Sequence, residues 1–152
     1  MVAAIAGTTP LNAEPLRVIV FAIAGHQLAL PMKAVFKISP CPPQADQAVD
    51  LLDLEGQAVR LLDLASRLNP NHQQQRRFLL LIQTQLDGLY GIPLAELPSM
   101  MGLSVPTIQA LPSTTQAQPL GQVCRYVSLQ PQESGPATLV FLLDLGLLLG
   151  ET

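Results

Sequence analysis

The stretch LALPMKAV, residues 28–35, returns later in the chain as YGIPLAEL, residues 90–97. In both copies an apolar run meets a proline, and an apolar residue again stands at the eighth position. A second pair follows in the same order, VRLLDLASRL at 59–68 and VFLLDLGLLL at 140–149. Two matches in matching order indicate an internal repeat. Each half then predicts a hairpin, a turn begun by proline, a connection, a second hairpin and a short helix.

Four hairpins are expected, because apolar and β-branched segments are separated by short turns that contain glycine. The turns fall at Ala24-Gly25, Glu55-Gly56, Asp87-Gly88 and near Ser134-Gly135-Pro136. The 14 prolines of the chain leave little room for helices longer than about ten residues. Closing short apolar strands into barrels removes their exposed edges. The sequence therefore predicts a mainly all-β fold of two small SH3-like, five-stranded β-barrel subdomains with short helices.

The domain organisation follows from the same segments. Residues 1–15 hold two prolines and no periodic pattern, so we expect a flexible arm there. Residues 16–150 should form a single domain of two intertwined barrel subdomains, roughly one around 30–75 and one around 78–145. Neither part is large enough to bury much surface alone, so we expect the two subdomains to pack together.

The amino-acid composition excludes several classes of protein. The chain has 152 residues, of which 49% are hydrophobic and 12% charged, enough apolar material for a core and too little charge for a disordered tail. Its net charge of -3 argues against a nucleic-acid partner, which needs a basic surface. The apolar stretch 139–150 is interrupted by Asp144 and is too short to span a bilayer. We expect a cytoplasmic protein without membrane insertion.

No catalytic or metal-binding pattern is evident. Cys41 and Cys124 do not make a disulfide framework, and buried or inert thiols are the simpler interpretation. His26 and His72 are far apart, with no further Cys or His at ligand spacing. The chain lacks a G-x-S-x-G motif, a P-loop and a G-x-G-x-x-G motif. We therefore expect no enzymatic activity, no cofactor and no metal.

Four blocks of sequence, taken in order, resemble the CheW-like domain family. They are VFAIAGHQLALPMKAVFKI at 20–38, VDLLDLEGQAVRLLDLASRL at 49–68, RRFLLLIQTQLDGLYGIPLAEL at 76–97 and TLVFLLDLGLLL at 138–149. The resemblance implies two small five-stranded barrels around a shared hydrophobic seam. It also implies a non-enzymatic adaptor that links chemoreceptor tips to a CheA-type histidine kinase, in chemotaxis or in systems that control type IV pili. In the family, a groove between the subdomains serves the receptor and the barrel ends serve the kinase.

The resemblance also carries individual positions. Val35 falls where the family has an apolar receptor-contact residue, and Lys37 falls on a nearby position that is usually acidic. Leu54-Glu55-Gly56 stands where the family has Leu-Arg-Gly, so glutamate replaces the arginine of the contact region. Arg60 stands where the family usually has proline. These changes of charge argue against the ordinary chemoreceptor contact and favour a divergent array, or a partner with complementary basic residues.

Two further groups complete the candidate surface. Phe36 and Ile38 flank Lys37, and Phe36 is the residue of this segment least expected in the core. Leu97 and Met100 belong to an apolar cluster in a proline-rich segment, where core filling is the simpler interpretation and an adaptable contact surface the functional one. The candidate partner-binding residues are therefore Val35, Phe36, Lys37, Ile38, Glu55, Gly56, Arg60, Leu97 and Met100.

Three functions follow from these observations. The first is a signalling adaptor between a chemoreceptor-type sensor and the regulatory domain of a CheA-type histidine kinase. The second is a divergent CheW-like protein that has lost receptor binding and regulates another partner. The third is a small β-barrel that binds RNA or a small molecule, although the acidic balance and the scarcity of aromatic residues count against RNA. Asp63 and Asp144 are expected to be helix N-caps and not functional groups.

Overall fold

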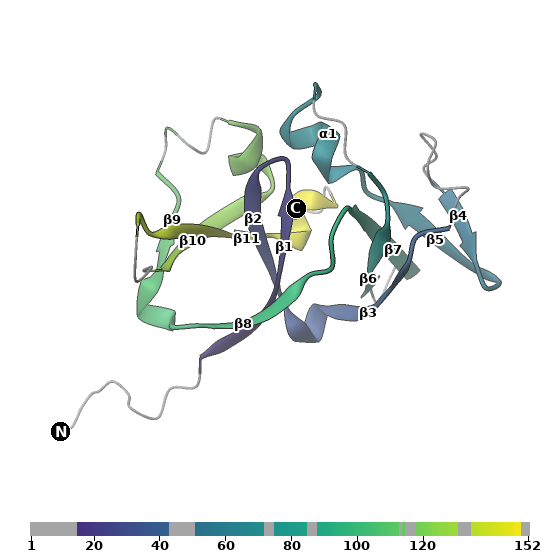
Figure 1. The fold of residues 1–152 in the computed structure, drawn as a ribbon, viewed down its shortest axis with the longest axis horizontal. Helices are drawn as coiled ribbons and strands as arrows, with labels where there is room; N and C mark the ends of the chain where they lie inside the picture. The colour runs from purple at the N-terminus through teal and green to yellow at the C-terminus, as the bar shows by residue number, and fades with distance from the viewer. Residues whose placement is uncertain are drawn as a thin grey trace.

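Two β-sheets account for most of the structure, a computed structural model that describes residues 15–42, 51–71, 75–84, 88–112, 114, 118–130 and 135–149. The two sheets lie side by side in Figure 1. The expected flexible arm, apart from Pro15, lies outside the described residues, as do His72 and Asp87. The prediction of a mainly all-β fold with short helices is confirmed.

The first sheet has six strands and the second has five. The six-stranded sheet has the order β8-β1-β2-β11-β10-β9, from β1 (Leu16–Ile23), β2 (His26–Pro31), β8 (Ser99–Leu103), β9 (Ile108–Ala110), β10 (Cys124–Gln130) and β11 (Thr138–Leu143). The five-stranded sheet has the order β3-β6-β7-β5-β4, from β3 (Val35–Pro40), β4 (Leu51–Leu54), β5 (Gln57–Leu61), β6 (Phe78–Thr84) and β7 (Gly88–Leu94). The described helices are η1 (Met32–Ala34), α1 (Leu64–Leu68), η3 (Val105–Thr107), η4 (Pro119–Gln122) and α3 (Leu145–Leu148).

The sheets divide the chain differently from the expected boundaries of 30–75 and 78–145. The β6–β7 hairpin joins β3, β4 and β5, whereas the β1–β2 hairpin joins β10 and β11. Two parallel pairings cause this division. They place β5 beside β7, with Val59 opposite Leu89, and β11 beside β2, with Phe141 opposite Leu28. One sheet also has a sixth strand that the five-strand expectation lacks, because the short β9 pairs with β10.

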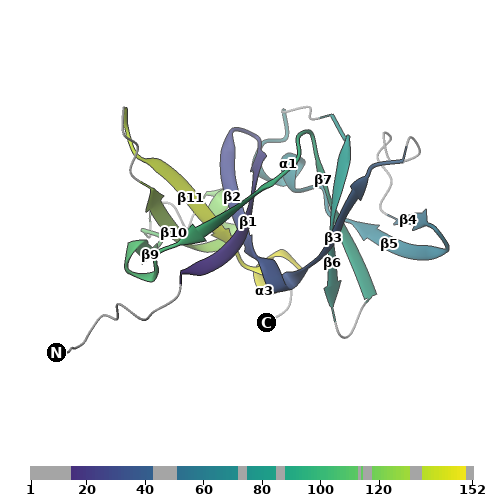
Figure 2. The same cartoon turned by 60° about the horizontal axis from the view of Figure 1, so that its bottom comes forward.

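The internal repeat is visible as an exchange of strands between the sheets. After the β1–β2 hairpin, η1 leads into β3, which leaves that sheet and pairs with β6 in the other. After the β6–β7 hairpin, the chain runs into β8, which pairs with β1. Figure 2 shows β3 and β8 making these two passages. Ile38 on β3 and Met100 on β8 thus occupy equivalent places, opposite Leu80 and Ile19 respectively.

Three apolar clusters hold the sheets together. Leu52, Val59, Leu61, Leu79, Leu81 and Leu89 fill the five-stranded sheet. Val18, Val20, Ala29, Leu103 and Val140 fill the six-stranded sheet. The third and largest cluster is shared, since it takes Ile19 and Leu28 from one sheet, Leu80 and Ile92 from the other, and Leu64 and Leu148 from the helices. As expected, the two subdomains pack against each other.

Two tight turns follow the sequence predictions. Ala24 and Gly25 join β1 to β2 with φ of 52° and 83°, and Glu55 and Gly56 join β4 to β5 with φ of 53° and 83°. Positive φ at both central residues is typical of the two-residue hairpin turn whose twist matches that of the strands. Both predicted turns are therefore confirmed.

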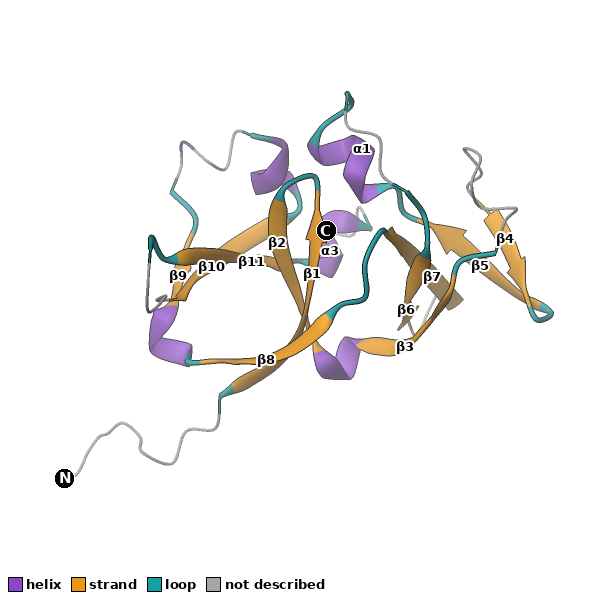
Figure 3. Cartoon of the chain, viewed as in Figure 1, coloured by secondary structure: helices purple, strands orange, loops and turns teal. Residues whose placement is uncertain are grey.

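The predicted helix N-caps are also confirmed. The backbone N–H of Ser66 donates to Asp63 Oδ1 at 3.2 Å at the start of α1, and that of Leu147 donates to Asp144 Oδ1 at 3.1 Å at the start of α3. Figure 3 shows the two helices lying between the sheets. Each aspartate satisfies an N–H group that the helix itself leaves without a partner.

Candidate partner-binding site

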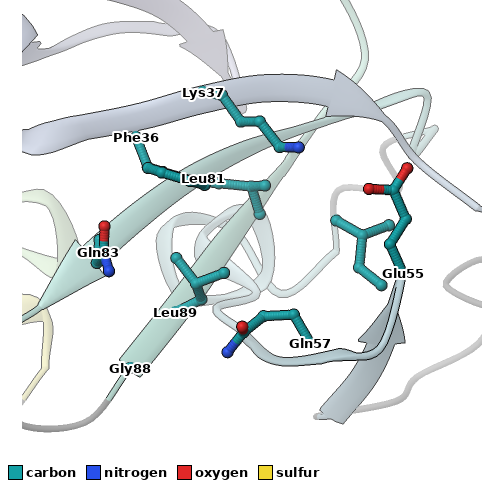
Figure 4. A pocket seen from close by; sticks show the side chains of 9 residues that line it. Phe36, Lys37, Glu55, Gln57, Leu81, Gln83, Gly88 and Leu89 are labelled. Carbon is teal, nitrogen blue, oxygen red and sulfur yellow. The ribbon is translucent and has the colours of Figure 1, made fainter.

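A pocket of about 180 Å³ opens at one end of the five-stranded sheet, and we call it the edge pocket. The two edge strands of the sheet, β3 and β4, both contribute to it (Figure 4). Its lining consists of Phe36, Lys37, Leu54, Glu55, Gln57, Leu81, Gln83, Gly88 and Leu89. Three of the nine candidate residues therefore meet here, although they come from separate segments of the chain.

The apolar part of the edge pocket belongs to the core of the five-stranded sheet. Leu81 and Leu89 are buried members of that sheet's cluster, and Leu54 packs against the same cluster. Since these leucines are held by the core, the pocket offers a preformed apolar surface and not one assembled from mobile side chains.

Phe36 reaches the pocket because of a β-bulge. Val35 lies opposite Ile82 and Lys37 lies opposite Leu81, so Phe36 is an extra residue between two consecutive partners on β6. A bulge re-aims the side chains around it. The Phe36 side chain is 51% exposed, whereas Val35 is half-buried against the shared cluster. The expectation that Phe36 stays out of the core is confirmed.

Two opposite charges stand at the mouth of the edge pocket. Lys37 Nζ lies 5.9 Å from the centroid of the Phe36 ring, a contact worth about 0.5–1 kcal/mol at an exposed site. Figure 4 shows the charged ends of Lys37 and Glu55 facing each other across the mouth. The ion pairs between described residues are Arg76 with Asp63 and Arg125 with Asp144. Within the described ranges, Glu55 thus has no cationic partner.

The remaining candidate residues lie outside the edge pocket. Ile38 is exposed on β3, and Gly56 follows Glu55 in the turn without lining the pocket. Arg60 is exposed on β5, opposite Leu51. Leu97 lies between β7 and β8, and Met100 lies on β8; they are 66% and 70% exposed, so the core-filling interpretation is wrong for both.

Two amide side chains of the pocket, Gln57 and Gln83, were not among the predicted site residues. A signal was available for Gln83, because side chains alternate along a strand and Gln83 therefore shares a face with Leu81. A polar residue near the end of a strand, at a position whose side chain faces the core, indicates the rim of a barrel. Gln57 has a weaker signal, its position directly after the Glu55-Gly56 turn.

Elsewhere a second hollow of about 370 Å³ is lined by Ala110, Gly121, Cys124, Arg125, Tyr126 and Leu147. Burial, with a smaller contribution from the Asp144 carboxylate, raises the pKa of the Cys124 thiol from 9.0 to about 12. This thiol is therefore protonated and a poor nucleophile near neutral pH. Arg125 is engaged with Asp144 at 3.0 Å.

The side chains of His26, Cys41 and Cys124 pack against apolar neighbours. The His26 ring meets the Phe141 ring edge-on, with centroids 6.0 Å apart. Neither Cys41 nor Cys124 forms a disulfide bond. In the part of the chain that the structure describes, no group of three His, Cys, Asp or Glu side chains is arranged to hold a metal ion.

Comparison with known proteins identifies the fold and the family. The chain resembles the crystal structure of the scaffolding protein TtCheW from Thermoanaerobacter tengcongensis, with a TM-score of 0.65 and 14% identity over 93% of each chain. No curated protein matches the sequence. The sequence model of the CheW-like domain matches residues 17–152, nearly the whole chain. The chain therefore belongs to the CheW-like domain family, a family of scaffolding adaptors in chemotaxis signalling.

Proposed function

We propose that this protein is a non-enzymatic adaptor that couples a chemoreceptor-type sensor to the regulatory domain of a CheA-type histidine kinase. Membership of the CheW-like family supports this role. The observation that carries it is the edge pocket, which unites the β3 segment with Leu54 and Glu55 at the β4–β5 turn. Both segments hold positions at which the family resemblance implies partner contacts, and here they share one surface.

The physical properties of this surface suit protein–protein contact. Phe36 offers an exposed aromatic side chain beside a rigid apolar base, which is the kind of anchor on which binding energy concentrates. Lys37 and Glu55 flank it, and rim charges set partner choice and association rate more than affinity. A single contact of this size would be weak, and several contacts in an array would compensate through avidity.

The two subdomains are proposed to act as one unit over residues 16–150. The shared apolar cluster supports this, because separating the sheets would expose side chains such as Leu28 and Leu80. Among the described helices none is long and apolar enough to cross a bilayer. We propose a cytoplasmic location, since the kinase that this adaptor would serve is a cytoplasmic partner.

Glu55 favours a second candidate, a divergent adaptor that lacks the ordinary receptor contact and serves a different partner. A carboxylate at the mouth of the edge pocket stands where the family resemblance implies a guanidinium. Such a reversal changes which surface charges of a partner are tolerated, because like charges at an interface are costly. The kinase contact is compatible with this candidate, whereas receptor binding is not.

Calorimetric titration of the full chain with the kinase regulatory domain and with a receptor tip from the same genome tests both candidates. We expect micromolar binding to the kinase domain and at least a tenfold loss for Phe36→Glu, since an anchor that the partner covers is worth more than about 1.4 kcal/mol. Leu129→Glu, at an exposed leucine on the six-stranded sheet, is the matched control and should bind normally. Absence of binding to both partners would overturn the adaptor role.

The same titration with Glu55→Arg separates the two candidates. If wild type binds only the kinase and the variant gains receptor-tip binding, the divergent adaptor is the correct function. If wild type already binds both partners, the first candidate holds and the charge at Glu55 does not exclude the receptor.

A further inference from the structure

We infer that the edge pocket receives one apolar side chain of a partner protein, with a cationic side chain beside it that pairs with Glu55. The inference deepens the proposed function, because it names the chemistry of the partner at that site. It combines three features of the pocket, namely its volume, its apolar base and the unequal availability of its two rim charges.

The volume fits a single large apolar side chain. An apolar cavity of about 150 Å³ holds one benzene molecule, and the edge pocket has about 180 Å³. Pockets for drug-sized ligands are larger, about 300 Å³ or more. Leu54, Leu81 and Leu89 make the base apolar. A leucine or phenylalanine side chain from a protein surface therefore fits the pocket better than a free metabolite does.

The rim charges favour a cation on the partner. Lys37 already has the electron-rich face of Phe36 near its ammonium group, at 5.9 Å from the ring centroid. Glu55 has no cation paired with it among the described residues. The other polar lining groups, Gln57 and Gln83, are neutral amides. Because the carboxylate would repel phosphate groups, a nucleic acid does not fit this mouth.

The turn itself does not require a glutamate. At the equivalent turn of the six-stranded sheet, Ala24 adopts φ of 52°, nearly the same as the 53° of Glu55. Asparagine, aspartate and glycine are the residues that this turn type favours. The backbone conformation of the turn therefore does not require the Glu55 carboxylate. The rigid turn nevertheless holds this carboxylate at the mouth of the pocket.

Lys37 allows the predicted charge preference of the pocket to be tested in the opposite direction. Its ammonium group faces Glu55 across the mouth in Figure 4, so it competes with any incoming cation. Removing the Lys37 charge should strengthen binding of a cationic partner, and removing the Glu55 charge should weaken it. A partner that instead brings an anion to Lys37 would give the reverse pattern.

The experiment titrates the ¹⁵N-labelled full chain with N-acetyl-leucyl-arginine amide and, in parallel, with N-acetyl-leucyl-glutamate amide. We expect the backbone amides of Gln57, Gly88 and Leu89 to shift, with the arginine probe bound about two- to fivefold more tightly, the range for an exposed ion pair. Glu55→Gln should abolish this preference and Lys37→Gln should increase it. Asp53→Asn is the matched control, because Asp53 is an exposed carboxylate on β4 outside the pocket lining, and it should leave the preference unchanged.

Three results would overturn the inference: no shift at the pocket amides with either probe, equal binding of the two probes, or an arginine preference that survives Glu55→Gln. None of these results bears on binding to the kinase domain, so the adaptor role would stand. Conversely, a clear arginine preference without any kinase or receptor binding would retain the pocket chemistry and overturn the adaptor role alone.

Discussion

Arg67 Nη1 donates a hydrogen bond of 2.9 Å to the backbone oxygen of Leu148. Arg67 lies in the last turn of α1, and Leu148 is the last residue of α3. The final carbonyls of a helix have no partner within it, and a cation there also interacts favourably with the helix dipole. This one side chain therefore ties the equivalent helices of the two halves of the chain to each other.

Replacing Arg67 with methionine should destabilise the protein by about 1.5 kcal/mol, because a partly buried hydrogen bond from a charged group is lost. Urea unfolding followed by circular dichroism measures the change. Arg60→Met is the control, since Arg60 is exposed on β5, and its effect should stay within about 0.5 kcal/mol. Equal effects of the two substitutions would show that the Arg67 bond contributes nothing to the stability of the fold.

The two helix caps should contribute separately to stability. Asp63→Ala and Asp144→Ala should each cost about 1 kcal/mol, the usual value of a lost N-cap. Each aspartate also forms an ion pair, Asp63 with Arg76 at 3.3 Å and Asp144 with Arg125 at 3.0 Å. Asp63 accepts a further hydrogen bond from Ser66 Oγ at 2.8 Å, so its loss should be the larger of the two. Thermal unfolding measures both variants against Asp53→Ala, which removes a carboxylate from a strand. A cap variant as stable as Asp53→Ala would contradict the capping role.

Gly91 leaves little room for a Cβ atom. A Cβ atom at Gly91 would lie 3.1 Å from Val59 Cγ1 and 3.3 Å from Leu61 Cδ2. Gly91→Ala should therefore overpack the five-stranded sheet and cost about 1–3 kcal/mol. Ala29 stands at the equivalent position of the six-stranded sheet and is fully buried there. Chemical unfolding is the measurement, and a variant as stable as wild type would mean that β5 and β7 separate easily.

Stability should fall with rising pH in the alkaline range because of Cys124. Burial raises the pKa of this thiol to about 12 in the folded protein, whereas in the unfolded chain it titrates near 9.0. When the pH is above the pKa of the unfolded thiol, the unfolded chain has lost a proton that the folded protein retains. The free energy of unfolding should then decrease by up to about 1.4 kcal/mol per pH unit.

The Cys124→Val variant isolates this effect, because it removes the thiol and fills a similar volume. Its free energy of unfolding should decline less steeply than that of wild type between about pH 9 and about pH 11. Urea unfolding at a series of pH values gives both curves. Parallel curves would mean that other groups cause the alkaline decline.

Sequence reasoning succeeded where local chemistry determines the structure. The turns at Gly25 and Gly56 require positive φ, and the Asp63 and Asp144 caps require a short acceptor before a helix. These features involve only neighbouring residues, so they can be inferred from a few letters. The bulge at Phe36 is also local, although the sequence indicated only that Phe36 would be exposed.

The partition of strands between the sheets was not predictable in this way. Both β2 and β7 are apolar enough to be the parallel neighbour of β5. Only packing in three dimensions decides that β7 takes this place. The exposure of Leu97 and Met100 was obscured for a related reason. Leu97 lies in the passage between the sheets, where no alternation reveals which side a residue faces. Met100 stands next to Met101 on β8, and two adjacent methionines do not reveal which one faces the core; Met101 packs against it.

The exchange of β3 and β8 between the sheets sets an order of events during synthesis. The five-stranded sheet is contiguous in the chain from Val35 to Leu94, so all of its strands are present once that segment has left the ribosome. The β1–β2 hairpin, made first, must wait for β8 and then for β11, which ends at Leu143. Because synthesis proceeds from the amino end, the hairpin made first receives its last partner strand only when β11 has emerged. A truncation near the carboxyl end would therefore uncover the apolar face of the β1–β2 hairpin near the amino end. Its effect would not be confined to the segments next to the cut.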